Sequence, residues 1–138
     1  MKNLKEFKFH HTGIAVKDFE KSIKFYKLLQ YKWYKSKVFR DKHQKVDLVL
    51  LEHDHLPRIE LVKPYSSLSP VSNYIKDNDN LIYHFCYEVD NFEEIEKILK
   101  KRFRVFNVSK PAPAILFDNR LVSFYYINQV GLIELLKK

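Results

Sequence analysis

The stretch FHHTGIAVKDFEKSIKFY, residues 9–26, decides how the chain begins to fold. Residues 8–16 read as a strand, and Asp18, which follows them, is a typical helix N-cap. Apolar side chains then recur at helical spacing, at Phe19, Ile23, Tyr26 and Leu29. This spacing predicts a helix over residues 19–29 with one buried face.

Three strand-like segments follow this helix, each rich in aromatic or β-branched residues and bounded by polar ones. They are YKWYKSKVF, QKVDLVLLEH and PRIELVK, at residues 31–39, 44–53 and 57–63. The first half of the chain is therefore predicted to form a strand, a helix and three strands.

The second half repeats this order. A strand is predicted at residues 81–89, and Asn91 begins a capping-box pattern before a helix that ends near Lys101. The strand-like segments after it are FRVFNV, AILFD, LVSFYYI and LIELLK, at residues 103–108, 114–118, 121–127 and 132–137. The pattern AILFDNRLVSF predicts a hairpin that turns at Asp118 and Asn119.

The two halves are related in sequence, because a shift of 73 residues places His11 on His84. Four further residues fall on identical ones: Val16 on Val89, Phe19 on Phe92, Glu20 on Glu93 and Lys24 on Lys97. The motifs RIELVK and LIELLK also correspond, so Glu60 follows His11 by 49 residues and Glu134 follows His84 by 50. A duplicated βαβββ unit with a histidine and a glutamate at matching places is hard to obtain from core packing alone.

Four residues are therefore candidate metal ligands: His11, Glu60, His84 and Glu134. Imidazole and carboxylate donors suit zinc, nickel, cobalt, manganese or iron in the divalent state. A pseudo-twofold axis between the two copies would bring the four donors to one divalent ion. A single strand histidine is usually a hydrogen-bonded structural residue, and a single strand glutamate usually faces water, so the duplication carries the argument.

Strand alternation predicts which side chains point toward such an ion. His11 shares its face with the small residues Gly13 and Ala15, which leaves space above the sheet, and His10 points the other way. The corresponding face in the second half carries His84, Cys86 and Glu88. Cys86 is the only cysteine, so an internal disulfide is impossible, and we expect a buried small residue rather than a reactive thiol.

Composition narrows the class of protein. With 46% hydrophobic residues in 138 the chain can bury a core, and it contains no run near the roughly 18 apolar residues of a membrane helix. The N-terminal residues lack the pattern of a signal peptide, so we expect a soluble cytoplasmic protein that does not engage membranes. The net charge of +8 favours anionic partners, but scattered lysines argue against nucleic acid.

The chain resembles the vicinal oxygen chelate superfamily, which includes glyoxalase I, bleomycin resistance proteins and methylmalonyl-CoA epimerase. The motifs that carry the resemblance are HTGIAVKDFEKSIKFY, IELVKP, SPVSNYI, LIYHFCYEVDN and GLIELL. It implies an α+β fold in which two tandem βαβββ modules form a curved mixed sheet around a metal-binding cleft. Module 1 would span about residues 7–64 and module 2 about residues 81–138, within one domain and joined by a linker at residues 65–80.

The resemblance also implies the site, with His11, Glu60, His84 and Glu134 as metal ligands. The implied chemistry is abstraction of a proton next to a carbonyl through a metal-bound enolate. Glu134 is the expected base, and Asp47, an acid within the apolar KVDLVLL, is a possible second base or an outward-facing strand residue. Tyr83, where epimerases commonly have a second histidine, and Glu60, where they commonly have glutamine, depart from the epimerase pattern.

Three functions follow from the resemblance. The first is a methylmalonyl-CoA epimerase-like isomerase acting on a 2-substituted acyl thioester of coenzyme A or phosphopantetheine. The alternatives are a glyoxalase I-like lactoylglutathione lyase and a non-catalytic binding or resistance protein, and a homodimer is expected in each case. Arg58, Lys110 and Arg120 are candidate phosphate contacts or else surface residues without such a role, whereas His10, His43 and the loop histidines His53 and His55 are expected to be solvated.

Overall fold

The computed structural model describes residues 7–77 and 80–138. The signal-peptide prediction rests partly on residues 1–6, and the predicted linker includes residues 78–79, all of which lie outside this description. The chain forms two compact units. The first unit contains residues 11–83, and the second unit contains the described residues up to His10 together with residues 84–138.

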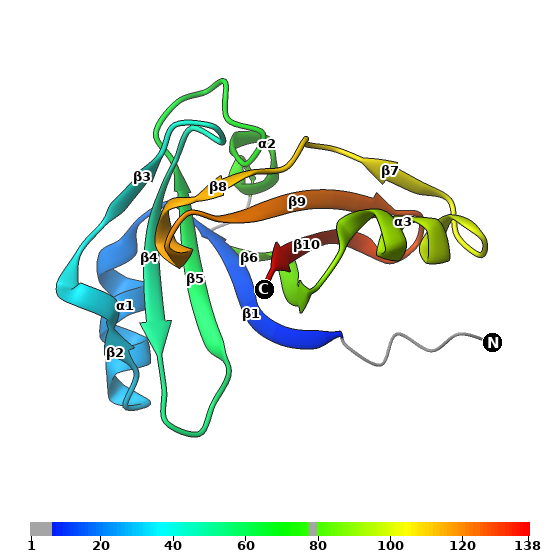
Figure 1. The fold of residues 1–138 in the computed structure, drawn as a ribbon. Coiled ribbons are helices and arrows are strands. Elements are labelled where there is room, and N and C mark those ends of the chain that lie inside the picture. The colour runs from blue at the N-terminus through cyan, green and yellow to red at the C-terminus, as the bar shows by residue number, and fades with distance from the viewer. Residues whose placement is uncertain (1–6, 78–79) are drawn as a thin grey trace. The chain divides into compact units, whose positions relative to one another are not determined.

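The first unit builds a mixed sheet in the order β2-β4-β5-β1, with β3 paired to β4 (Figure 1). Its strand β1 pairs in parallel with β5, and the other pairings are antiparallel. The elements are β1 (Lys8–Val16), α1 (Phe19–Leu28), β2 (Lys32–Trp33), η1 (Tyr34–Ser36), β3 (Phe39–Asp41), β4 (Val46–Glu52), β5 (Arg58–Pro64) and α2 (Ser72–Ile75).

The second unit repeats this plan in the order β6-β10-β9-β7, with β8 paired to β9. Here β10 pairs in parallel with β6 and antiparallel with β9. The elements are β6 (Asn80–Val89), α3 (Phe92–Lys100), β7 (Val105–Asn107), β8 (Ala112–Ala114), η2 (Ile115–Phe117), β9 (Arg120–Ile127) and β10 (Gly131–Lys137). The predicted α+β class with mixed sheets and few helices is therefore confirmed.

Both main helices begin where their caps predict. The Asp18 carboxylate accepts a hydrogen bond from the backbone N–H of Glu20 at 3.1 Å, and the Asn91 side chain accepts one from Glu94 at 3.0 Å. Each cap satisfies a backbone donor that the first helical turn leaves without an intrahelical partner. Within the described residues, no helix has both the length and the apolar character needed to cross a membrane.

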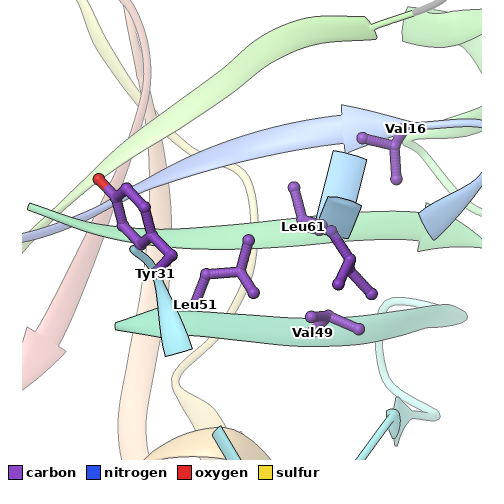
Figure 2. Packing of buried hydrophobic residues seen from close by; sticks show 6 residues of the cluster. Val16, Tyr31, Val49, Leu51 and Leu61 are labelled. Atoms are coloured by element: carbon purple, nitrogen blue, oxygen red, sulfur yellow. The ribbon is translucent and has the colours of Figure 1, made fainter. Parts of the chain in front are cut away.

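Each helix covers one face of its own sheet, and this decides which strand residues are left for a site. In the first unit the core consists of Val16, Ile23, Tyr31, Val49, Leu51 and Leu61, most of which Figure 2 labels. The equivalent core of the second unit consists of Val89, Val105, Tyr125, Ile127, Ile133 and Leu135. Alternation then turns the intervening strand residues to the opposite face of each sheet.

The structure corrects two predicted strands. Residues 31–39 are not one strand, because β2 ends at Trp33 and is followed by a 3-10 turn with left-handed φ angles of 54° at Lys35 and 46° at Ser36. Most of the segment AILFD forms the 3-10 turn η2, and only Ala114 belongs to a strand, β8. Residues 65–80, the predicted linker, contain the short helix α2. The turn at Asp118 and Asn119 is confirmed, with φ angles of 53° and 60°.

Candidate metal-ligand pairs

His11 and Glu60 form a buried pair in the first unit. Parallel pairing of β1 with β5 sets Gly13 opposite Glu60, so His11 and Glu60 lie on the same face of the sheet. His11 is 0% exposed and Glu60 is 5% exposed, and His11 Nε2 lies 3.7 Å from Glu60 Oε2. Gly13, which is itself buried, adds no side chain beside them.

The residues that flank Glu60 explain its orientation. Ile59 and Leu61 both pack in the core under α1, and successive strand residues point to opposite faces. Glu60 is therefore directed away from the helix-covered core and toward the His11 face. A carboxylate buried in this way is costly unless a cation or hydrogen-bond donors compensate its charge.

His84 and Glu134 form the corresponding pair in the second unit. The parallel register of β10 with β6 sets Glu134 opposite Cys86, which shares its face with His84. His84 is 2% exposed and Glu134 is 3% exposed, and His84 Nε2 lies 3.4 Å from Glu134 Oε2. The ring of Phe124 meets the His84 imidazole edge-on, with 5.3 Å between ring centroids, and so holds the plane of the imidazole.

The apolar neighbours of Glu134 repeat those of Glu60. Ile133 and Leu135 pack in the core under α3, and Glu134 therefore points to the opposite face. The predicted duplication of a histidine and a glutamate at matching positions is thus present in the geometry of each unit.

Burial lowers the pKa of His84 from 6.5 to about 3. The imidazole is therefore neutral at neutral pH, which is the protonation state that coordinates metal ions. Each unit supplies one imidazole and one buried carboxylate, a donor set that fits a divalent transition metal or zinc. The histidines and glutamates of both pairs thus suit the divalent metal ion that the sequence predicts.

Cys86 is fully buried, as predicted, and lies on the His84 face directly opposite Glu134. The Cys86 side chain is small, so it fills less of the space beside Glu134 than an aromatic side chain at the same position would fill. The predicted shared face of His84, Cys86 and Glu88 is confirmed, because Tyr87 and Val89 pack in the core on the other side.

The structure does not bring Asp47 beside the His11–Glu60 pair. Asp47 stands opposite Lys63 on β5, and this register places it on the same face as the core residue Leu61, opposite to the face of Glu60. The Asp47 carboxylate accepts two hydrogen bonds from the Arg40 guanidinium, at 2.8 and 3.1 Å. The run KVDLVLL is apolar on both faces, so the sequence offered no alternation from which to predict this orientation.

The loop histidine His53 has a structural role that the sequence did not predict. Its Nδ1 accepts hydrogen bonds from the backbone N–H groups of His55 and Leu56, at 2.9 and 3.0 Å. Because Nδ1 is the acceptor, Nε2 carries the proton and donates to the carbonyl of Leu29 at 3.0 Å. These bonds fasten the turn between β4 and β5 to the end of α1.

The predicted phosphate contacts are distributed over both units. Arg120 donates to Glu88 at 2.7 Å and to the Lys137 carbonyl at 2.9 Å, so its guanidinium joins strands of the second unit. Arg58 stands opposite His11 in the register of β1 with β5, and its Nε lies 3.7 Å from Glu52. Lys110 is exposed on the second unit.

One further set of residues was not singled out from the sequence. Lysines and aromatic residues alternate in KWYKSKVF, residues 32–39, and the structure gathers several of them around the turn η1. Such alternation is a signal for binding anionic groups that carry a ring system.

Comparison with known proteins agrees with this geometry. A model of the glyoxalase/bleomycin resistance protein/dioxygenase superfamily matches residues 10–124. The mitochondrial methylmalonyl-CoA epimerase of Dictyostelium discoideum is 27% identical over 135 residues, which are 95% of this chain and 78% of that protein.

Two solved structures share the fold. One is methylmalonyl-CoA epimerase from Mycobacterium tuberculosis, with a TM-score of 0.79 and 21% identity over 99% of this chain and 92% of that one. The other is a variant methylmalonyl-CoA epimerase from Streptomyces coelicolor in complex with 2-nitronate-propionyl-CoA, with a TM-score of 0.76 and 18% identity over 95% and 96% of the two chains. The chain belongs to the glyoxalase/bleomycin resistance protein/dioxygenase superfamily.

Proposed function

We propose that this protein is a metal-dependent isomerase that removes and returns a proton next to the carbonyl of an acyl thioester, most like methylmalonyl-CoA epimerase. The observation that carries the proposal is that two buried His–Glu pairs occupy repeated positions, His11 with Glu60 and His84 with Glu134. The epimerase from Dictyostelium discoideum, similar along 95% of the chain, supports the choice of reaction.

The proposed ligands of one divalent ion are the four residues of these pairs. Zinc, nickel, cobalt, manganese and iron all suit two imidazoles and two carboxylates. When bound, such an ion supplies Lewis acidity, which makes a proton next to a coordinated carbonyl easier to remove. The neutral state of His84, which its low pKa of about 3 maintains, means that no proton competes for that ligand at neutral pH.

The carboxylates are then proposed to remove the proton and to return it. Glu134 is the proposed base, because it is buried beside His84 and lies opposite Cys86 instead of a bulky side chain. Inversion at carbon needs a second group on the other side of the carbon atom. We assign that role to Glu60 in preference to Asp47, since Glu60 shares the His11 face whereas Asp47 lies on the opposite face and is bound by Arg40.

A lactoylglutathione lyase is the second candidate. That reaction moves a proton between neighbouring carbons, and two equivalent His–Glu pairs provide carboxylates for this transfer as well. A carboxylate at Glu60, where the epimerase pattern commonly has an amide, is the observation that favours this second function.

The test is proton exchange in heavy water. The metal-loaded protein is incubated with methylmalonyl-CoA, and loss of the α-proton signal is followed by NMR, with the hemithioacetal of methylglyoxal and glutathione as a parallel substrate. Catalysed exchange of methylmalonyl-CoA supports the epimerase. Conversion of the hemithioacetal alone would establish the lyase instead, and binding without turnover of either compound would leave a non-catalytic binding protein.

The proposal includes a homodimer, which the family resemblance implies, and a location in the cytoplasm. Sedimentation equilibrium of the purified protein tests the first part, since a dimer has twice the mass of the 16.7 kDa chain. Localisation of a tagged full-length chain by fluorescence tests the second part.

A further inference from the structure

The turn after β2 contains two lysines, Lys35 and Lys37, and two residues with an unusual backbone conformation. Lys35 and Ser36 both have left-handed φ angles, 54° and 46°, which residues with a side chain rarely adopt. The indole Nε1–H of Trp33 donates to the carbonyl of Lys37 at 3.0 Å and closes the turn. This conformation therefore has a fixed support in the structure, although neither lysine packs in the core.

The same turn brings an aromatic ring to each of the two lysines. The rings of Tyr34 and Phe39 are nearly parallel, with an interplanar angle of 18° and 6.2 Å between centroids. Lys35 Nζ lies 5.2 Å from the centre of the Tyr34 ring, and Lys37 Nζ lies 5.1 Å from that of Phe39. We call these four residues, Tyr34, Lys35, Lys37 and Phe39, the lysine–aromatic ledge.

The charge around the ledge is strongly positive. Residues 31–45 contain six lysines and arginines and one acid, Asp41, whose carboxylate accepts bonds from the backbone of His43 and Gln44. Two other cations of the segment are matched by acids, Lys32 by Asp54 and Arg40 by Asp47. Within the described part of the chain, the ammonium groups of Lys35 and Lys37 lie over aromatic rings and pair with no acid, so their charges are available to an anion.

One residue of the ledge, Phe39, lies on the same sheet face as the His11–Glu60 pair. Phe39 stands opposite Leu48 on β4, and Leu48 stands opposite Val62 on β5, two residues from Glu60. Two strand spacings and two residue rises separate the Cα atoms of Phe39 and Glu60, which amounts to roughly 12 Å. Leu48 and Val62, which lie between them, are buried, so the acyl group would reach Glu60 from the edge of this face while the far end of the ligand stays at the exposed lysines.

We propose that the lysine–aromatic ledge binds the 3′-phosphoadenosine diphosphate end of a coenzyme A thioester whose acyl group lies at Glu60. The inference rests on the proposed function and gives its substrate a second point of attachment. Exposed lysines beside aromatic rings match a ligand that combines phosphates with a purine, because the charges pair while the purine stacks. The flexible pantetheine arm spans the distance between the two ends.

We prefer the ledge to Arg58 and Arg120 as the phosphate contact. Arg120 is held by Glu88 and the Lys137 carbonyl, and Arg58 lies near Glu52.

Trp33 makes the proposal directly measurable. It is the only tryptophan of the chain and is bonded to the ledge turn, so its fluorescence reports on binding there. Coenzyme A, 3′-dephospho-coenzyme A and pantetheine are titrated separately. We expect saturable changes with coenzyme A, roughly five- to tenfold weaker binding without the 3′-phosphate, and no change with pantetheine.

Charge-neutral variants identify the residues involved. Lys35→Gln and Lys37→Gln should each weaken coenzyme A binding roughly five- to tenfold, and Tyr34→Leu should weaken it by a similar factor through lost stacking. In a turnover assay the same variants should raise KM and leave kcat unchanged. The matched control is Lys97→Gln on α3, an exposed lysine of the second unit, which should alter neither binding nor turnover.

The outcomes separate this inference from the proposed function. If coenzyme A binds with normal affinity to both lysine variants, or pantetheine binds as well as coenzyme A, the ledge assignment is overturned whatever the enzyme does. If coenzyme A binds through the ledge while methylmalonyl-CoA is not exchanged, the ledge stands and the proposed reaction fails.

Discussion

His84 Nε2 and Glu134 Oε2 lie 3.4 Å apart in the second unit, and both side chains are almost fully buried. Two donors that share an ion at 2.0–2.2 Å from each are separated by roughly 3 Å. The spacing of this pair therefore already resembles that of two ligands of one ion. Burial keeps the imidazole neutral, so the carboxylate is not compensated by a histidine cation at neutral pH.

The first prediction is that replacing a proposed ligand weakens metal binding. Either His84→Ala or Glu60→Ala should weaken binding of a divalent ion by roughly 100-fold or more, because changes outside the ligand set already cost 10- to 100-fold. Plasma mass spectrometry after dialysis should then find less than stoichiometric metal in each variant and a full equivalent in the unaltered protein.

The control for this experiment is Glu88→Gln. Glu88 is a carboxylate on the same strand face as His84, but it is paired with Arg120, so its replacement should leave the metal content unchanged. Full metal occupancy in His84→Ala and Glu60→Ala would show that these residues do not bind the ion.

The second prediction concerns the two equivalent cores. Leu61 and Leu135 are both 0% exposed and follow the two glutamates in the repeated IEL motifs. Truncation of either to alanine should reduce the free energy of unfolding by about 2–5 kcal/mol, through lost burial and the cavity left behind. Urea denaturation measures the difference.

Leu28 is the matched control, because it is a leucine on α1 that is 82% exposed. Leu28→Ala should change stability by no more than about 0.5 kcal/mol. Equal losses for Leu28→Ala and Leu61→Ala would contradict the assignment of the first core.

Much of this fold follows from local patterns in the sequence. The strand at Lys8–Val16 and the helix that starts at Phe19 were predictable because alternation, helical spacing and the Asp18 cap all agree. The orientations of Glu60 and Glu134 were predictable for a similar reason, since each is flanked by two aliphatic residues that must face the core.

The predictions from sequence were wrong where the local composition fits more than one backbone conformation or side-chain orientation. The aromatic residues around positions 34–36 are typical of a strand, but the positive φ angles at Lys35 and Ser36 interrupt it. Neither lysine nor serine favours such φ angles, so the residue types do not indicate the interruption. The orientation of Asp47 was hidden by apolar neighbours on both faces of β4. The link from His53 to Leu29 depends on a contact between residues 24 positions apart, which local patterns cannot reveal.

The third prediction concerns pH and the Glu88–Arg120 pair. Burial alone would raise the pKa of Glu88, but the hydrogen bond and charge of Arg120, with the charges of His10 and Lys8, outweigh it and lower the pKa below 4.5. A carboxylate whose pKa is lower in the folded state adds stability above its unfolded pKa and loses it as the pH falls through the folded value.

Glu88→Gln should therefore destabilise the metal-free protein by about 1 kcal/mol or less near neutral pH, and by progressively less below the ordinary carboxyl pKa. Urea unfolding across this acid range provides the measurement. Arg120→Met should remove the same pH dependence, and the double variant should show no further change. A loss of stability in Glu88→Gln that stays constant with pH would mean that the effect comes from packing instead of charge.

The fourth prediction separates the two bases considered for the reaction. Glu134→Gln keeps the shape of the side chain but cannot accept a proton, so exchange of the α-proton of methylmalonyl-CoA should fall by roughly 10²- to 10⁴-fold. Asp47→Asn should change the rate by no more than about threefold, because Asp47 faces away from Glu60 and binds Arg40. NMR of the exchange in heavy water gives both rates, and metal content is measured in each sample so that loss of the ion is not mistaken for loss of the base. If Asp47→Asn abolished exchange while Glu134→Gln retained it, the roles of the two carboxylates would be reversed, and the face of β4 that carries Asp47 would have to contact the substrate.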